Sequence, residues 1–274
     1  MKLSTYAYAI CMVLLTWNTA SAQSKPILIE YWAAHNPASV TIVDHSAWDD
    51  ILQKYTQTTD AGLNLFDYAN IATDDKIQLE DYLDLLSSVT VTELNLDEQR
   101  AYWTNAYNAI TVNLVIDAYP VSSIRKVNSF FGFGPWNDEL FEVEGMMLSL
   151  NNIEHGILRP IWNDPRIHYS VNCASFGCPN LANRAWTAAN MEAMLDEGAR
   201  NFINSEYGVQ KIKGNGVKVS SIYRWFKVDF GSDDASIIAH IRRYADEDLH
   251  KELAAVTRID GHGYDWTLNE IKKD

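Results

Sequence analysis

The longest regular pattern of hydrophobic and polar positions lies in residues 95–120, NLDEQRAYWTNAYNAITVNLVIDAYP. Its middle is almost entirely apolar, aromatic, small amide or hydroxyl, the pattern of a helix buried on most of its faces. Asn95, followed three residues later by Glu98, resembles a capping box, and Pro120 closes the far end. We therefore expect a central helix over residues 97–118. The positions that we expect to be almost wholly buried are Trp103, Ala106, Tyr107, Ile110 and Leu114.

Shorter patterns surround this segment. In DHSAWDDILQKY, apolar residues recur at spacings of three and four, and Ser46 can cap the helix that this spacing predicts. SLNNIEHGILRPIW is typical of a helix that ends at Pro160, and RIHYSV of a short buried strand. A hairpin is expected around residues 214–216. Helices and strands mix without a regular βαβ alternation, so we predict an α+β fold with a small, mostly antiparallel sheet.

The N-terminal residues have a different composition from the rest of the chain. Residues 1–22 carry one cation, a short apolar run and a small-residue ending, which predicts a cleaved secretory signal peptide. The run is too short to span a bilayer, so we expect no membrane span after cleavage and a periplasmic or secreted protein. Residues 23–43 are irregular and are expected to form an N-terminal strap. We expect residues 44–270 to form a single domain.

The formal net charge of the chain is −14. A field of this sign repels the phosphates of nucleic acids and anionic lipid surfaces. We therefore expect no nucleic acid among the partners.

Two asparagines, Asn105 and Asn108, fall three residues apart on one side of the predicted central helix. A buried amide costs free energy unless its hydrogen bonds are made. They could tie neighbouring loops to the helix, or Asn105 could donate to an oxyanion and Asn108 could bind substrate. The spacing leaves both roles open.

Groups that could carry out chemistry gather between residues 154 and 178: Glu154, His155, His168, Cys173 and Cys178. A cysteine attacks as a thiolate and needs a base or a positive environment to lower its pKa. On a straight strand, His168 and Cys173 would lie about 16 Å apart on opposite faces. His155 belongs to another element and is the better partner on this geometry.

The short loop ASFG between Cys173 and Cys178 supports a second interpretation. An exported protein folds in an oxidising compartment, and a turn here could bring the two Cα atoms within disulfide range. Cys173 is thus either half of a disulfide or a free nucleophile. A metal site has little support, because zinc-binding pairs are usually matched by a second pair downstream. We expect neither a metal nor a cofactor.

Two arginines flank the same region. Arg159 and Arg166 could each pair with Glu154, or could hold a substrate carboxylate through their two-pronged donors. Both roles remain open at this stage.

Five segments together resemble a known family. DHSAWDDILQKY, EQRAYWTNAYNAITVNLV, LNNIEHGILR, RIHYSVNCASFGCPNL and YDWTLN occur in the order of the family catalogued as domain of unknown function 547, over residues 44–269. The family is widespread in bacteria, often with export signals. A relationship to papain-like thiol hydrolases and acyltransferases would imply a nucleophilic cysteine at the start of a buried helix. Here that helix offers Asn105 instead.

Two functions are consistent with these observations. The first is an exported hydrolase or acyltransferase for a small peptide-like or amide substrate. Cys173 would be its nucleophile, His155 or His168 its base, and Glu154 the group that orients the histidine. The second is a non-catalytic envelope module that binds a ligand or a protein partner in an aromatic cleft.

Overall fold

The structure, a computed structural model, describes residues 25–128 and 132–272. The predicted signal peptide lies outside the described residues. The helices are α1 (Ser46–Tyr55), α2 (Thr73–Ser88), α3 (Leu96–Ala118), α4 (Arg159–Trp162), α5 (Met191–Ile203), α6 (Ile222–Trp225), α7 (Asp234–Tyr244) and α8 (Glu247–Leu253). The strands are β1 (Thr56–Thr58), β2 (Asn64–Phe66), β3 (Phe141–Val143), β4 (Met146–Leu148), β5 (Val209–Lys213), β6 (Gly216–Ser220) and β7 (Arg258–Gly263).

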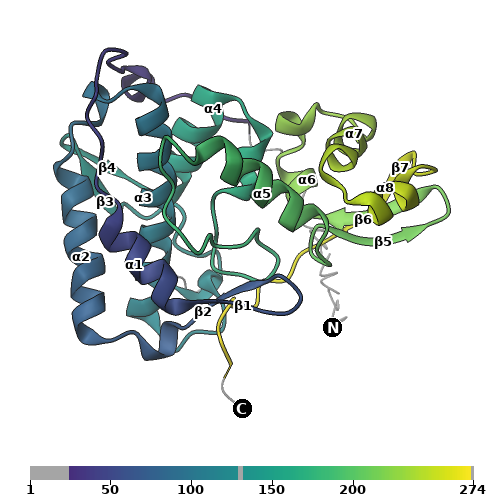
Figure 1. The fold of residues 1–274 in the computed structure, drawn as a ribbon, viewed down its shortest axis with the longest axis horizontal. Coiled ribbons are helices and arrows are strands. Elements are labelled where there is room, and N and C mark those ends of the chain that lie inside the picture. Colours follow the sequence, from purple (N-terminus) through teal and green to yellow (C-terminus); the bar gives the residue numbers. More distant parts are fainter. Residues whose placement is uncertain (1–24, 129–131, 273–274) are drawn as a thin grey trace, which may run out of the picture.

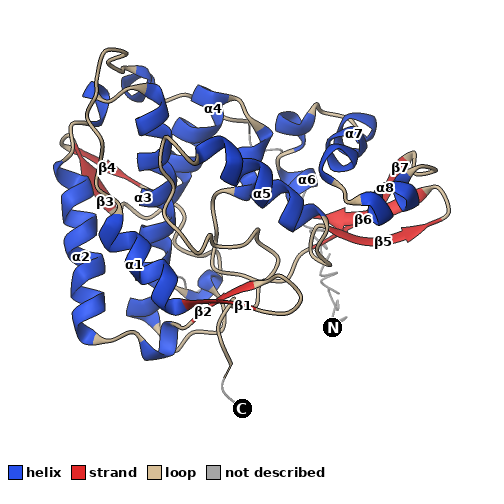
Figure 2. Cartoon of the chain, viewed as in Figure 1, coloured by secondary structure: helices blue, strands red, loops and turns tan. Residues whose placement is uncertain are grey.

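The strands form small, separate sheets, as Figure 2 shows. β1 pairs with β2 and β3 with β4, both antiparallel, while β5 and β6 form an antiparallel hairpin to which β7 adds in parallel. The predicted hairpin and the predicted α+β class are therefore confirmed. Among the described residues, no helix has the length and apolar character that a membrane crossing requires.

Helix α3 lies at the centre of the larger hydrophobic cluster, packed against α2 and the segment before α4 (Figure 1). Trp103, Ala106, Tyr107 and Ile110 are buried as predicted. Leu114 is only half-buried, which corrects that part of the prediction. It lies on the side of the helix nearer the solvent, where the apolar pattern does not distinguish full from partial burial.

The start of α3 confirms only half of the predicted capping box. The Asn95 side chain accepts the Glu98 N–H at 3.0 Å, as an N-cap does. Glu98 does not reach back to Asn95, because its carboxylate accepts the N–H of Val43 at 2.8 Å. This bond fastens the N-terminal strap to the central helix. At α1, Ser46 is the first helical residue rather than the N-cap, which is His45, and the Asp44 side chain accepts the Ser46 N–H at 2.9 Å.

The helix predicted to end at Pro160 continues to Trp162, and residues Asn152–Leu158 form a π-helix inside it. Proline has no N–H, so residue 160 cannot donate to the carbonyl of Gly156, as in an α-helix, or to that of His155, as in a π-helix. The strap supplies replacements: Ile27 N–H donates to His155 O at 3.1 Å and Ile29 N–H to Gly156 O at 2.9 Å. The π-helix and the proline that follows it therefore present two carbonyls to which the strap bonds.

The segment RIHYSV is a 3₁₀ helix, Pro165–Tyr169, so the predicted strand is wrong. Pro165 starts the helix, and the Asp164 side chain accepts the Arg166 N–H at 2.8 Å. This local Asp-Pro start outweighs the apolar character of the segment. The 16 Å separation that a straight strand would give to His168 and Cys173 therefore does not apply.

A second hydrophobic cluster is built from α5, α6, α7 and the β5–β6–β7 sheet. Figure 1 shows this part of the chain beside the α3 region, connected to it through the loop before α5 and through the segment after β7, which returns to β2. The candidate site lies where elements of both clusters meet.

Candidate functional site

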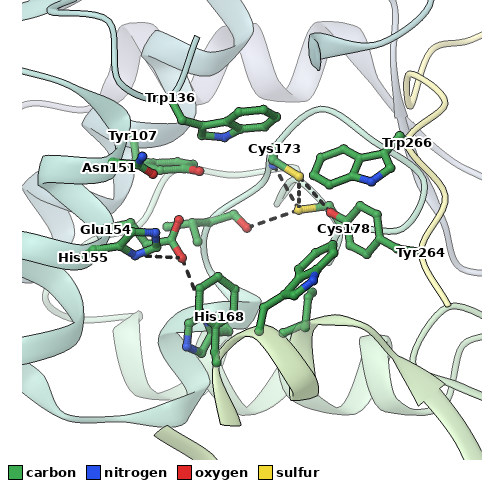
Figure 3. Close-up of a pocket in the computed structure, with 14 residues that line it drawn as sticks. Tyr107, Trp136, Asn151, Glu154, His155, His168, Cys173, Cys178, Tyr264 and Trp266 are labelled. Atoms are coloured by element: carbon green, nitrogen blue, oxygen red, sulfur yellow. Dashed lines mark hydrogen bonds and ion pairs between the residues drawn. The ribbon is translucent and has the colours of Figure 1, made fainter. Parts of the chain in front are cut away.

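A pocket of about 180 Å³ is lined by residues from both clusters (Figure 3). α3 and the π-helix contribute one side, the loop after the 3₁₀ helix contributes the thiols, and α6 and the segment after β7 contribute aromatic rings. The lining aromatic residues are Tyr107, Trp136, Trp225, Phe226, Tyr264 and Trp266. The polar lining residues are Asn151, Glu154, His155, His168, Cys173 and Cys178.

The Cys173 sulfur has three polar neighbours. It lies 2.9 Å from the Tyr264 hydroxyl, 3.4 Å from the Ser175 hydroxyl and 2.9 Å from the Cys178 sulfur. No hydrogen bond joins Cys173 to a histidine among the described residues. The predicted Cys–His pair is therefore absent, because both histidines lie across the pocket from the thiol (Figure 3).

Cys178 acts as a hydrogen-bonding partner of Cys173. Its sulfur accepts the Cys173 backbone N–H at 3.0 Å and lies 2.9 Å from the Cys173 sulfur. Both cysteines are free thiols, and their 2.9 Å separation exceeds the roughly 2.05 Å of a disulfide bond. The predicted disulfide is thus not formed in this structure, although the ASFG loop does bring the two side chains together.

These contacts shift the pKa values of the two thiols in opposite directions. Burial alone would raise the pKa of Cys173, but hydrogen bonds from Cys178, Ser175 and Tyr264 outweigh it and lower that pKa overall. Burial and the adjacent Cys173 raise the pKa of Cys178. Burial and the charges of the two cysteines also raise the pKa of Tyr264, which keeps its hydroxyl proton available for donation. Cys173 is therefore the thiol that ionises first.

Glu154 lies between the two histidines on the opposite wall. Its Oε1 is 3.6 Å from Nδ1 of His155 and 3.7 Å from Nδ1 of His168. The carboxyl is buried, and its charge helps burial to raise the pKa of Tyr107. The π-helix places Glu154 and His155 side by side at the pocket, and such segments are frequent at functional sites.

His168 is oriented by a carboxylate that the sequence did not single out. Its Nε2 bonds Oδ2 of Asp229 at 2.7 Å, and its ring stacks on Phe226 at 4.2 Å between centroids. Asp229 also accepts from Nε of Arg159 at 2.7 Å. Burial opposes ionisation of Asp229, but these bonds from His168 and Arg159 lower its pKa overall. The pairing fixes the Nδ1 atom of His168 toward Glu154.

His155 is held differently. Arg159 Nη1 lies 3.1 Å from His155 Nδ1, so this nitrogen is the acceptor and Nε2 carries the proton of the neutral ring. Burial lowers the pKa of His155, and Arg159 acts in the same direction. The ring is therefore neutral near pH 7 and can act as an N–H donor.

The two asparagines of α3 tie loops to the helix. Asn105 exchanges two hydrogen bonds with the backbone of Trp186, at 2.7 and 3.0 Å. Asn108 donates to Ser170 O and accepts from Asn172 N–H, both at 2.8 Å. Neither asparagine lines the pocket. Asn105 is therefore not available as an oxyanion donor, nor Asn108 for substrate, whereas Asn108 does position the loop that leads to Cys173.

In the ion pairs of the described residues, both arginines bind carboxylates other than Glu154. Arg159 binds Asp229 and supports the histidines from behind. Arg166 binds Asp164 at 2.7 Å, Glu192 at 2.7 Å and Asp196 at 2.9 Å, in an ion-pair network that does not line the pocket. Arg166 therefore has a structural role, and Arg159 supports the site indirectly.

The sequence analysis missed Asp229, Tyr264 and the tryptophans of the pocket. Asp229 lies 61 residues from its partner His168, and Tyr264 lies 91 residues from Cys173. Only the YDWTLN segment, which carries part of the family resemblance, marked Tyr264 and Trp266. No group of three or more His, Cys, Asp or Glu side chains among the described residues is arranged to hold a metal ion.

Comparisons with known proteins agree with the resemblance seen in the sequence. No curated protein and no solved structure matches the chain. Residues 91–203 match the family described as "Protein of unknown function, DUF547". This segment contains α3, the π-helix and both pocket cysteines. The match confirms the resemblance of the central part of the chain to the DUF547 family.

Proposed function

We propose that the protein is a thiol-dependent hydrolase or acyltransferase that acts on a small peptide-like or amide substrate. The observation that carries the proposal is the Cys173 thiol, whose pKa is lowered by its hydrogen bonds at the wall of an aromatic pocket. Enzymes use such a thiolate to form covalent acyl intermediates. Glu154, His155 and His168 face it across the same pocket.

In the first step, the Cys173 thiol gives its proton to the Glu154–His168 pair, and the thiolate attacks the carbonyl carbon of the substrate. The sulfur–carbon bond forms, the carbon–nitrogen bond breaks, and the amine leaves with a proton from the Glu154–His168 pair. Asp229 keeps His168 in the tautomer that directs Nδ1 toward Glu154, so the pair can hold and release this proton. The N–H of neutral His155 supplies a hydrogen bond to the carbonyl oxygen as negative charge develops there.

In the second step, water or an acceptor amine or alcohol attacks the thioester. The Glu154–His168 pair takes the proton of this nucleophile, the carbon–sulfur bond breaks and Cys173 returns as a thiolate. Glu154 thereby acquires a different role from the one expected, because Asp229 rather than Glu154 orients the histidine. Water gives a hydrolase, and another acceptor gives an acyltransferase.

A small activated ester such as p-nitrophenyl acetate tests this function. Reduced protein should acquire an acetyl group on Cys173, located by peptide mass spectrometry, faster than free cysteine at the same pH. Cys173→Ser should abolish the acetyl adduct. Glu154→Gln should retain the adduct longer, because the attack of water on the thioester is slowed. Glu252→Gln, an exposed change of the same charge, is the matched control.

A non-catalytic binding module is the second candidate. The observation that favours it is the missing hydrogen bond between Cys173 and either histidine. If Cys173 reacts no faster than free cysteine and no adduct forms, the enzyme proposal fails. Ligand binding in the aromatic pocket would then be the function that the site supports.

We also propose that the protein is exported, on the strength of its N-terminal pattern, and that Cys173 and Cys178 form a disulfide in an oxidising compartment. Oxidation of the two thiols would transfer two electrons and release two protons to a disulfide or quinone oxidant. The oxidised protein would lack the nucleophile, so acylation should require reduction. Mass spectrometry of the unreduced protein from its native compartment tests both the cleavage after residue 22 and the disulfide; two separately alkylated cysteines would exclude the disulfide.

A further inference from the structure

We infer that the pocket binds a small organic ammonium group, so that the substrate is an amide or ester that carries a protonated or quaternary amine. This inference rests on the proposed function and names its substrate class. It comes from three features of the pocket: its aromatic rings, its net charge and its size.

The rings form a cage on the side of the thiols. Trp266 lies 5.6 Å from Trp136, 5.7 Å from Trp225 and 4.5 Å from Tyr264, measured between ring centroids, and all four rings are half-buried. The face of an aromatic ring attracts a cation within about 6 Å, and quaternary ammonium ions are bound by such cages.

Rings of this pocket already hold cations of the chain itself. The Arg159 guanidinium lies 4.8 Å from the centroid of Phe226, and that of Arg125 lies 5.4 Å from Trp266. Arg125 does not line the pocket, and its guanidinium lies at the solvent-exposed edge. These contacts show that ring faces here are oriented so that a positive charge can approach them.

The polar end of the pocket supplies negative charge. Glu154 and Asp229 carry two negative charges, and the Asp229 charge is balanced by its partner Arg159. Transfer of a proton from Cys173 to His168 leaves this sum unchanged, so the Glu154 charge at this end of the pocket is not balanced by an arginine or lysine ion pair of the described residues in either state. Glu154 is buried with only 7% of its surface exposed, where little solvent screens its attraction for a cation.

The size of the pocket limits the ligand. Its volume of about 180 Å³ is smaller than the roughly 300–1,000 Å³ of pockets that hold drug-sized ligands. A single aminoacyl or choline-sized group fits this space. The substrate that we infer therefore places its ammonium among the rings and beside Glu154, and its carbonyl at Cys173.

Calorimetric titration of the Cys173→Ser protein separates binding from reaction. Choline is the probe, and 3,3-dimethyl-1-butanol, which replaces the ammonium with a neutral group of the same shape, is its control. We expect choline to bind at least tenfold more tightly. Glu154→Gln and Trp266→Leu should each reduce this preference several-fold, whereas Glu252→Gln should leave it unchanged.

Equal binding of the two probes, tighter binding of the alcohol, or no binding of either would overturn the ammonium site. The two variants remove different features, so loss of folding in one leaves the other as a test. Failure of this inference is distinct from failure of the proposed function. Acylation of Cys173 by a neutral ester without choline preference would remove the ammonium site alone, and choline preference without acylation would remove the enzyme alone.

Discussion

Helix α3 and the π-helix Asn152–Leu158 are both buried and pack against each other, yet they differ in what they leave free. α3 is regular, and the side-chain amides of Asn105 and Asn108 each donate one hydrogen bond to, and accept one from, the backbone of neighbouring loops. The π-helix is irregular, leaves two carbonyls to the strap and presents Glu154 and His155 to the pocket. The comparison indicates that the regular element stabilises the fold and that the irregular one supplies polar side chains to the pocket.

The largest change in stability should come from the regular element. Ile110 is 4% exposed, so Ile110→Ala removes buried methyl groups and leaves a cavity. We expect a loss of about 2–5 kcal/mol in the free energy of unfolding, measured in urea. Leu114→Ala, on the half-buried side of α3, is the control and should cost clearly less. A nearly neutral Ile110→Ala would contradict the central role of α3.

The next effect tests the connection from α3 to the thiol loop. Asn108→Ala removes the partners of Ser170 O and Asn172 N–H, both of which are buried. An unsatisfied buried group costs about 1–3 kcal/mol, so we expect a loss of about 2 kcal/mol in unfolding free energy. The acylation of Cys173 should fall as well, because the loop before it loses its anchor. Unchanged stability and reactivity together would show that this connection is unimportant.

A smaller effect should follow from a change on the irregular side. A Cβ at residue 156 would lie 2.6 Å from Cδ1 of Ile29, so Gly156→Ala forces the strap to move. Because the Ile29 side chain can shift, we expect Gly156→Ala to lower the free energy of unfolding by only about 1 kcal/mol. In a protein that already carries Ile29→Ala, the Gly156→Ala change should lower the free energy of unfolding by clearly less than about 1 kcal/mol. Additive effects of the two changes would argue against contact between the strap and the π-helix.

The comparison also explains what the sequence could predict. Periodicity identified α1 and α3, because a repeat of apolar residues determines a buried helical face, and the Asn95 cap identified the start of α3. The hairpin and the α+β class followed from similar local patterns. The 3₁₀ helix Pro165–Tyr169 was missed because a short apolar run suits a strand equally well, although Asp164-Pro165 was a visible signal for a helical start.

The site was predicted less completely than the fold. Glu154, His155, His168, Cys173 and Cys178 were identified and all line the pocket. Their partners were not, because Asp229 and Tyr264 meet them only through tertiary packing of distant segments. The roles of Asn105 and Arg166 depend on which backbone and carboxylate groups face them, and the sequence does not specify these.

The most direct test of the central claim is the pH dependence of Cys173 alkylation by iodoacetamide in reduced protein, followed on the Cys173 peptide by mass spectrometry. The lowered pKa means that the thiolate persists to lower pH, so the midpoint should fall below the value of about 8.5 for an ordinary cysteine. Tyr264→Phe removes a donor at 2.9 Å and should move the midpoint upward. A midpoint at or above the ordinary value, unchanged in Tyr264→Phe, would contradict the assignment of Cys173 as an activated nucleophile.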